Sequence, residues 1–355
     1  MAPMFIPGPV DVDEDVLMAQ TQPMLPHRST EFEEFFRRAE GKARKVFLTE
    51  SRVFILASSG TGLQEATVRN LVSGSMLSCV NGAFGKRWYN VAQTNGKQVD
   101  LLETDWQQPI TPELVAEALK GKSYDILTVV HNETSTGLMN PIKEIALAVK
   151  EASPDTLVCV DAVSSLSGAR LEMDAWGLDL VLTSSQKCLA LPPGLSLCGV
   201  NEKAMERAER VEHRGWYFDF LRLEKHRTAN STPATPALSL IYALDVQLDR
   251  IFEEGLENRF ARHSAMAERC QSWAVENGFD LFAPEGFRSQ TVTTVENNRG
   301  VNVGELNAFL LEGGMRIAAG YDPIKERTFR IGHMGELTVD DVNALLSAME
   351  DFLNQ

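Results

Sequence analysis

The stretch "LDLVLTSSQKCLALPPG", Leu178 to Gly194, decides the fold, because it joins an apolar run of strand length to a single cation. Lys187 follows that run directly and precedes a second apolar run and two prolines. A polar or charged residue at the end of an otherwise buried strand is typical of α/β sheets, in which ligands bind beyond the carboxyl ends of the strands. The same pattern recurs along the chain.

Short apolar runs alternate with amphipathic stretches from the N-terminal region to about residue 230. Five further runs have strand length and composition: 52–58, 76–80, 98–103, 126–130 and 156–161. Their two-sided apolar character is typical of strands covered by helices on both faces. The sequence therefore predicts an α/β fold with a mostly parallel sheet.

A different pattern begins at Ala237. Apolar residues then recur every three or four positions, and a second helical stretch follows over 259–275. The remaining segments alternate between strand and helix and predict a smaller C-terminal α/β subdomain. The predicted division is an N-terminal segment over 1–17, a large domain over 18–240 and a small domain over 241–355.

Composition excludes several classes of protein. The chain has 34 basic and 49 acidic residues, so its net charge of 34 − 49 = −15 disfavours nucleic acid and anionic membranes as partners. Its five cysteines are widely spaced and its six histidines lack metal-ligand spacing, so neither a disulfide framework nor a metal site is predicted. The N-terminus lacks a basic region before an apolar stretch, and no apolar run reaches 18 residues, which predicts a cytoplasmic protein.

Polar residues collect at the predicted strand ends, which meet at one crevice. The turn at 59–62, "SGTG", opens a helix, and its amide groups and hydroxyls suit a phosphate. Taken alone, the turn is equally compatible with a tight strand-to-helix connection, and both nucleotide-binding fingerprints are absent. The other strand ends carry "HNETSTG" at 131–137, Asp161 and Lys187.

Asp161 and Lys187 each have an ordinary interpretation. Asp161 can be a capped strand-end carboxylate, and Lys187 can extend its amine to the surface past an apolar stem. Together with the turn at 59–62, however, they supply what pyridoxal 5'-phosphate requires: a phosphate cradle, a carboxylate for the ring nitrogen and a lysine for the aldehyde. The sequence thus predicts this cofactor, with Lys187 as the Schiff-base lysine and proton carrier.

Nine motifs, in order, carry a resemblance that covers nearly the whole chain. They are "FIPGPV" (5–10), "HRSTEF" (27–32), "SSGTGLQEA" (58–66), "NGAFGKRW" (81–88), "HNETSTG" (131–137), "VDAVSSLSG" (160–168), "SSQKCLALPPG" (184–194), "STPATPALSLIYAL" (231–244) and "FRIGHMG" (329–335). With them the chain resembles the class V aminotransferases of pyridoxal-phosphate fold type I, in the alanine–glyoxylate and serine–pyruvate or serine–glyoxylate branch.

The resemblance implies a set of cofactor-binding residues: Ser59, Gly60 and Thr61 at the phosphate, Phe84 stacked on the ring, Thr134 near the phenolic oxygen, Asp161 at the ring nitrogen, and Gln186 and Lys187 at the aldehyde. It also implies that Thr235 reaches the phosphate bound by a neighbouring subunit. The active site is then expected to be complete in a homodimer. Thr232 departs from an often aromatic position of the family.

Arg330 matches the family's arginine for the substrate α-carboxylate, a task suited to a planar guanidinium. Pro7 and Gly8 match the segment that borders the substrate. No second substrate-facing arginine can be named from the sequence. The resemblance therefore implies a small monocarboxylate donor, alanine or serine, and an oxo acid acceptor, glyoxylate or pyruvate.

Three alternatives stay open. Phosphoserine transamination needs a further cation, for which His27 and Arg28 are candidates. A lyase or cysteine desulfurase would share the cofactor, but desulfuration needs a reactive cysteine on a polar loop, whereas Cys188 directly follows Lys187. A non-catalytic cofactor-binding protein is the third alternative, and the intact set of site residues argues against it.

Overall fold

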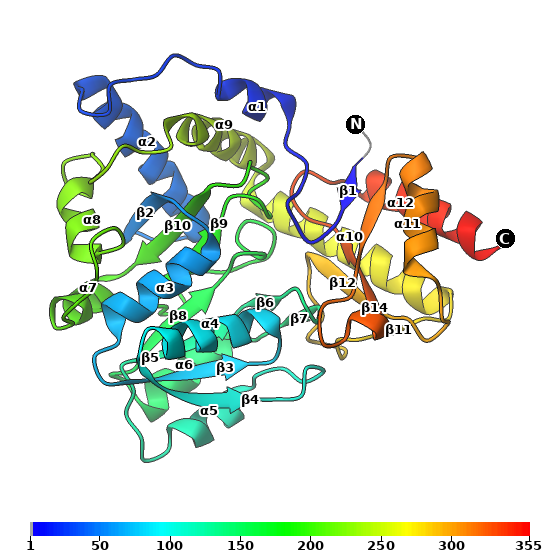
Figure 1. The fold of residues 1–355 in the computed structure, drawn as a ribbon, viewed down its shortest axis with the longest axis horizontal. Coiled ribbons are helices and arrows are strands. Elements are labelled where there is room, and N and C mark those ends of the chain that lie inside the picture. The colour runs from blue at the N-terminus through cyan, green and yellow to red at the C-terminus, as the bar shows by residue number, and fades with distance from the viewer. Residues whose placement is uncertain (1–2) are drawn as a thin grey trace.

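A seven-stranded sheet forms the centre of the larger part of the molecule (Figure 1). The computed structural model describes residues 3–355. The strand order is β2 (Arg52–Ala57), β10 (Leu195–Val200), β9 (Leu180–Ser184), β8 (Leu157–Asp161), β5 (Ile126–Val130), β3 (Ser75–Val80) and β4 (Gln98–Glu103). All six predicted strands are confirmed. The sequence did not predict β10, which is antiparallel to both of its neighbours.

Helices cover both faces of this sheet, as predicted. They are α2 (Thr30–Phe47), α3 (Gly60–Leu71), α4 (Ala83–Thr94), α5 (Pro112–Leu119), α6 (Ile142–Ala152), α7 (Glu202–Glu209), α8 (Phe220–Arg227) and α9 (Leu238–Glu254). Successive strand residues enter opposite cores: Val53 and Ile55 pack in one, Phe54 and Leu56 in the other. This alternation gives the sheet two apolar faces.

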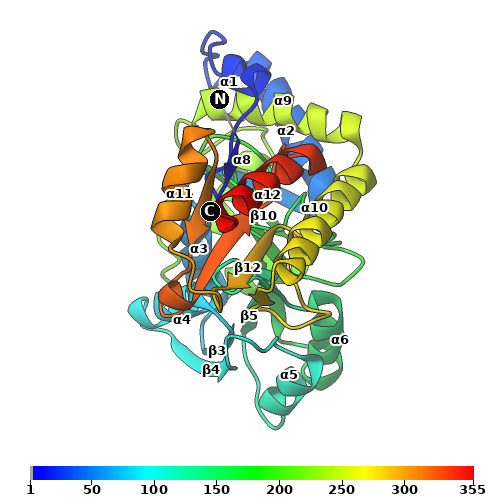
Figure 2. The same cartoon turned by 90° about the vertical axis from the view of Figure 1, so that its right-hand side faces the viewer.

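The smaller part of the molecule is built on a second sheet (Figure 2). Its strand order is β1 (Met4–Phe5), β13 (Arg316–Ala319), β14 (Thr328–Gly332), β12 (Val292–Glu296) and β11 (Asp280–Leu281). Three helices accompany it: α10 (Leu256–Glu276), α11 (Val303–Glu312) and α12 (Val339–Leu353). Thr338 is the N-cap of α12 and forms a capping box with Asp341.

The N-terminal strand β1 pairs in parallel with β13, so the first residues described belong to the sheet formed by the C-terminal part of the chain. Short elements α1 (Glu14–Ala19), β6 (Asn132–Glu133) and β7 (Leu138–Met139) complete the order. The domain boundaries predicted from sequence stay predictions. No helix within residues 3–355 is both long and apolar enough to cross a membrane.

Candidate active site

A cavity of about 220 Å³ lies where strands β5, β8 and β9 end. Its walls come from the turn before α3, the first turns of α3 and α4, and the segments that follow the three strands. Eight of the nine residues predicted to bind the cofactor line this cavity, and Thr235 is the exception. The carboxyl ends of parallel strands have therefore brought together side chains from most of the large domain's length.

The N-terminus of α3 forms one wall of the cavity. Ser59 is the N-cap, and its hydroxyl accepts a hydrogen bond from the Gly62 amide at 3.4 Å. A Cβ at Gly60 would lie 2.5 Å from Cγ2 of Val163, so the helix approaches the end of β8 this closely because residue 60 is glycine. The first-turn amides of a helix lack intrahelical partners and carry partial positive charge, which suits the phosphate of the predicted cofactor.

Asp161 ends β8 and is 4% exposed. One carboxylate oxygen accepts a hydrogen bond from the Val163 amide at 2.9 Å, and the other accepts one from Nε2 of Gln64 at 2.8 Å. Burial raises the pKa of Asp161, while these two hydrogen bonds and the charges of Arg87 and Lys187 lower it. Two hydrogen bonds leave a carboxylate with free lone pairs, so Asp161 can also accept a ring N–H.

Lys187 lies just beyond β9 and is largely buried. Burial lowers the pKa of its amine to about 8. Nζ donates a hydrogen bond to the carbonyl of Pro7, and a Cβ at Gly8 would come within 2.9 Å of Nζ. The N-terminal segment thus covers the lysine, and Gly8 permits this contact. The structure places Pro7 and Gly8 at the site, and their substrate-binding role stays a prediction.

Phe84 lies in the first turn of α4, at a helix start whose N-cap, Gly82, has no side chain. Glu133 caps this helix in place of an N-cap side chain. Its Oε2 accepts hydrogen bonds from the amides of Phe84 at 2.9 Å and Gly85 at 3.1 Å. Glu133 is fully buried, and burial raises its pKa. The sequence reasoning missed this role. Its signal is an acidic residue inside an otherwise uncharged motif, 131–137.

Arg330 reaches the site from β14 of the small sheet. Nε donates to the Ala319 carbonyl and Nη1 to the Thr134 carbonyl, both at 3.1 Å. Arg330 is 9% exposed, and burial lowers its pKa. Thr134 follows β5 in the large sheet and lines the cavity, so this hydrogen bond joins the two parts of the molecule at the site.

Arg87 supplies a guanidinium to the cavity wall itself, which Arg330 does not line, and sequence reasoning missed it. Nη1 donates to the Thr61 hydroxyl and Nη2 to the Tyr321 hydroxyl, both at 3.3 Å, and its guanidinium carbon lies 4.7 Å from the Phe84 ring centroid. Its spacing from Phe84, three residues along one helix, is a signal that could have placed it on the same face.

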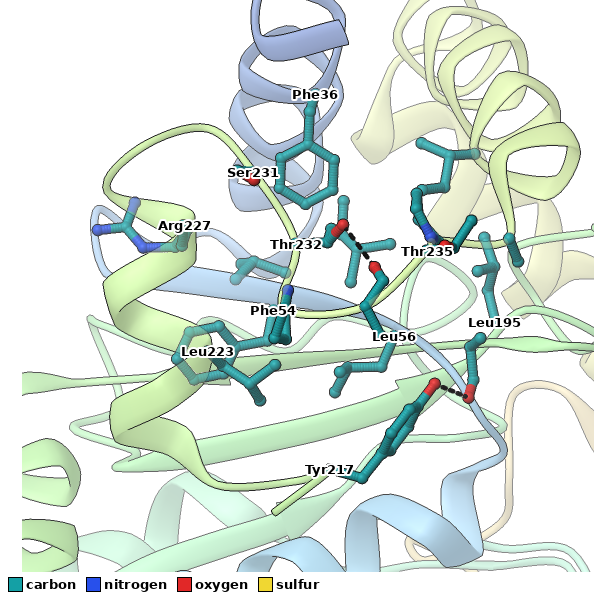
Figure 3. A pocket seen from close by; sticks show the side chains of 18 residues that line it. Phe36, Phe54, Leu56, Leu195, Tyr217, Leu223, Arg227, Ser231, Thr232 and Thr235 are labelled. Atoms are coloured by element: carbon teal, nitrogen blue, oxygen red, sulfur yellow. Dashed lines mark hydrogen bonds between the residues drawn. The ribbon is translucent and has the colours of Figure 1, made fainter. Parts of the chain in front are cut away.

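Thr235 lies in a separate groove above β2 (Figure 3). Thr232 and Thr235 come from the segment before α9, and the β2 residues Phe54 and Leu56 lie beneath them. Arg28 is bound to this same segment, donating to the Thr232 carbonyl at 2.6 Å. Thr235 does not line the cofactor cavity of its own chain. Its predicted role, at the phosphate bound by a neighbouring subunit, stays a prediction.

The cysteines do not resemble those of a desulfurase. All five are buried free thiols. Burial raises the pKa of Cys188 to about 12, so this neighbour of Lys187 is a thiol rather than a thiolate at neutral pH. A buried thiol of raised pKa is a poor nucleophile, and the geometry thus disfavours the desulfurase alternative.

Comparison with known proteins gives the family. The model described as "Aminotransferase class-V" matches residues 16–345. An L-aspartate–glyoxylate aminotransferase of Paracoccus denitrificans is 34% identical over 95% of this chain and 87% of its own. A serine–glyoxylate aminotransferase of Methylorubrum extorquens is 33% identical over 94% of this chain and 86% of its own.

A solved structure extends this likeness to the fold. It is an alanine–glyoxylate aminotransferase from Nostoc sp., which superposes with a TM-score of 0.93 at 30% identity and covers 99% of this chain and 94% of its own. The cavity supplies a phosphate cradle, a buried carboxylate and a lysine of lowered pKa, and these residues fit the predicted cofactor. The chain belongs to the class V aminotransferase family and is a pyridoxal-phosphate-dependent aminotransferase.

Proposed function

We propose that the protein transfers the amino group of a small amino acid, alanine or serine, to glyoxylate or pyruvate. The observation that carries this proposal is Arg330, a buried guanidinium that hydrogen-bonds to two neutral carbonyls beside the cavity of Lys187. A planar guanidinium binds a carboxylate through two parallel hydrogen bonds. A substrate carboxylate can therefore replace the two carbonyl oxygens as the acceptor of the Arg330 N–H groups. The relatives named for serine–glyoxylate and alanine–glyoxylate transfer support the same substrates.

The residues of the chain divide the chemistry among them. Pyridoxal phosphate, when bound, supplies an electron sink for the charge left on the substrate Cα after it loses a proton. Asp161 accepts the ring N–H and so keeps the ring nitrogen protonated. Lys187, with a pKa of about 8, takes the Cα proton as a neutral amine and returns it as an ammonium group.

Substrate binding also draws on both parts of the molecule. Arg330 holds the α-carboxylate from the small sheet, while Asp161 and Lys187 act from the large one. A ligand shared between the two parts favours their close approach and the exclusion of water from the proton transfers. The covering segment at Pro7 and Gly8 belongs to the same side as Arg330, because β1 pairs within the small sheet.

The protein is proposed to act as a homodimer. Thr235 and its groove lie away from the cavity of the same chain. This position supports a contact between Thr235 and the phosphate bound by a second copy of the chain. Trp216 and Tyr217, near this groove, are 54% and 43% exposed, as aromatic residues of an interface are in a separated subunit. Light scattering gives the mass in solution, and a monomer that retains full activity would exclude this part of the proposal.

A cytoplasmic location is also proposed. Its support is the set of five free, buried thiols, which is typical of proteins from reducing compartments. Fractionation of the cells that produce the protein, with a cytoplasmic and a secreted marker followed in parallel, tests the location.

The visible spectrum of the purified protein tests the transfer itself. Alanine or serine should bleach the visible band of the lysine-bound cofactor, and glyoxylate should restore it. Aspartate, glutamate and phosphoserine, added singly, serve as comparison donors. A visible band that neither alanine nor serine changes would overturn the proposed substrates.

A second candidate donor is a dicarboxylate such as aspartate, and Arg87 is the observation that favours it. Arg87 lines the cavity and hydrogen-bonds to neutral hydroxyls, so its charge is available to a second carboxylate. The relative named for L-aspartate–glyoxylate transfer supports this donor. If the candidate is right, Arg87→Gln lowers kcat/KM for aspartate by about 100-fold relative to that for alanine. Equal losses for both donors would exclude it.

A further inference from the structure

We propose that Gln64 is a positioning residue that fixes the orientation and the negative charge of Asp161 toward the cofactor's ring nitrogen. Gln64 is a buried polar residue in the second turn of α3. The inference rests on the role of Asp161 toward the cofactor and does not depend on which amino acid is the donor.

Gln64 contacts two segments that build the site, the end of β8 and the start of α4. It is 1% exposed, and its Nε2 donates to Oδ2 of Asp161 at 2.8 Å. The same nitrogen lies 3.5 Å from the carbonyl oxygen of Phe84. The main-chain oxygen of Gln64 accepts a hydrogen bond from Nε1 of Trp88 at 3.1 Å. One residue of α3 thereby joins the strand end that carries the carboxylate to the helix that carries the stacking ring.

The chemistry of Asp161 explains why an amide suits this place. A buried carboxylate tends to take up a proton, and a protonated Asp161 could no longer accept the ring N–H with its charge. An amide N–H stabilises the ionised form without adding a charge to the cavity. Together with the Val163 amide, it holds one donor on each carboxylate oxygen and so fixes the plane of the group.

The other half of the amide supports the same conclusion. Oε1 of Gln64 is buried and has no hydrogen-bond partner in residues 3–355. A buried acceptor without a partner is costly, and a methionine of similar size would fill the space without that cost. The amide is therefore explained by its donor, which meets Asp161, and not by packing alone.

The test measures binding of 4'-deoxypyridoxine 5'-phosphate to the apo-protein. This probe lacks the aldehyde, so its affinity does not involve a bond to Lys187. Gln64→Met should weaken binding by about tenfold near neutral pH, the effect of one hydrogen bond to a charged group. In a plot of affinity against pH, the loss of affinity at low pH (the acid limb) should also begin at a higher pH, because Asp161 loses a group that lowers its pKa.

A double-mutant cycle separates this role from a structural one. In an Asp161→Asn background, Gln64→Met should change binding by less than about twofold, because there is no carboxylate charge left to hold. Thr67→Val, a change to another buried polar residue of α3, is the matched control and should bind the probe as the parent does.

Two results would overturn the proposal. One is parental binding, with an unshifted acid limb, by folded Gln64→Met. The other is an equal loss in the parental and Asp161→Asn backgrounds, which would show that Gln64 acts through packing. Thermal unfolding monitored by circular dichroism establishes that each variant is folded, and Gln64→Leu repeats the measurement if the methionine variant is not.

Discussion

Two groups of buried charges lie on either side of Cys188, and they differ in what they bind. Arg259, 1% exposed, forms ion pairs of 2.8 Å with Glu254 and Glu336 and also donates to the Cys188 carbonyl. In and beside the cofactor cavity, by contrast, Asp161 and Arg330 hydrogen-bond to neutral groups. The first group is complete within the chain, and the second has its charges available to a ligand.

The difference separates stability from function. A buried charge is tolerated when it is paired, so the Arg259 cluster serves as a support that holds the chain beside Lys187. Buried charges without a direct ion pair are typical of ligand sites, and we propose that the cofactor and the substrate carboxylate are the partners of Asp161 and Arg330. Changes in the two groups should therefore affect different measured quantities.

The largest effect is expected from Lys187→Ala. The variant should lose the visible, borohydride-reducible absorbance of the lysine-bound cofactor and at least about 10³-fold in kcat, because it lacks both the amine and the proton carrier. Lys203→Ala, on α7, is the control with unchanged absorbance. An unchanged band in Lys187→Ala would refute the assignment of this lysine.

The next effect contrasts Arg259→Met with Arg330→Met in the apo-protein. Arg259→Met removes two ion pairs, but Glu254 keeps Arg262 and Glu336 keeps Gln247, so the free energy of unfolding should fall by about 2–3 kcal/mol. Arg330→Met leaves two carbonyls and should cost about 1–2 kcal/mol. Urea unfolding of both variants measures the two costs.

Activity should show the reverse order. Arg330→Met is expected to lose about 10²–10³-fold in kcat/KM for alanine, the value of a bidentate charged contact, while folded Arg259→Met loses less. Equal stability costs, or a larger activity loss in Arg259→Met, would contradict the division between the two groups.

The sequence predicts the residues at the cavity better than it predicts the ion pairs of Arg259. Strand ends and matched motifs located Asp161, Lys187 and Arg330, because apolar runs and local motifs are visible along one chain. The partners of Arg259 are Glu254 at the end of α9 and Glu336 beyond β14. No sequence motif indicates that these three side chains form ion pairs. Strand β10 was also missed, although its six residues follow Pro192, Pro193 and Gly194, a sequence that ends the preceding segment.

The same limit explains the residues missed in the cavity. Gln64 and Glu133 act on neighbours that fold beside them, at sequence separations of 97 and 49 residues. Arg87 was hidden because its charge on α4 has the pattern of an ordinary exposed helix residue. Sequence reasoning therefore identified the predicted cofactor-binding residues that line the cavity better than the residues that hold them in place.

A smaller effect is expected from Glu133→Gln. One carboxylate oxygen becomes an NH₂ group facing backbone N–H donors, so the start of α4 should lose about 1–3 kcal/mol and the cofactor should bind more weakly through Phe84. Cofactor affinity from fluorescence quenching gives the measurement. Glu144→Gln, at an exposed position of α6, is the control, and an unaltered affinity in Glu133→Gln would show that Phe84 needs no such anchor.

The smallest effect concerns pH. Covalent capture of the cofactor aldehyde requires the neutral amine of Lys187, whose pKa is lowered by burial to about 8. The neutral fraction, and with it the capture rate, should rise about fivefold between pH 7 and pH 8, by about a further twofold up to pH 9, and then level off. Stopped-flow absorbance after mixing apo-protein with pyridoxal phosphate follows the rate.

A second variant sharpens this test, because Arg330 also lowers the pKa of Lys187 through its charge. Arg330→Met should therefore move the rise to higher pH, whereas Asp161→Asn, which removes a charge that raises the pKa, should move it to lower pH. A profile that stays in place in both variants would mean that neither charge contributes to the pKa of Lys187, which burial and its other neighbours then set. The unpaired charges of the cavity would then act on the substrate and not on one another.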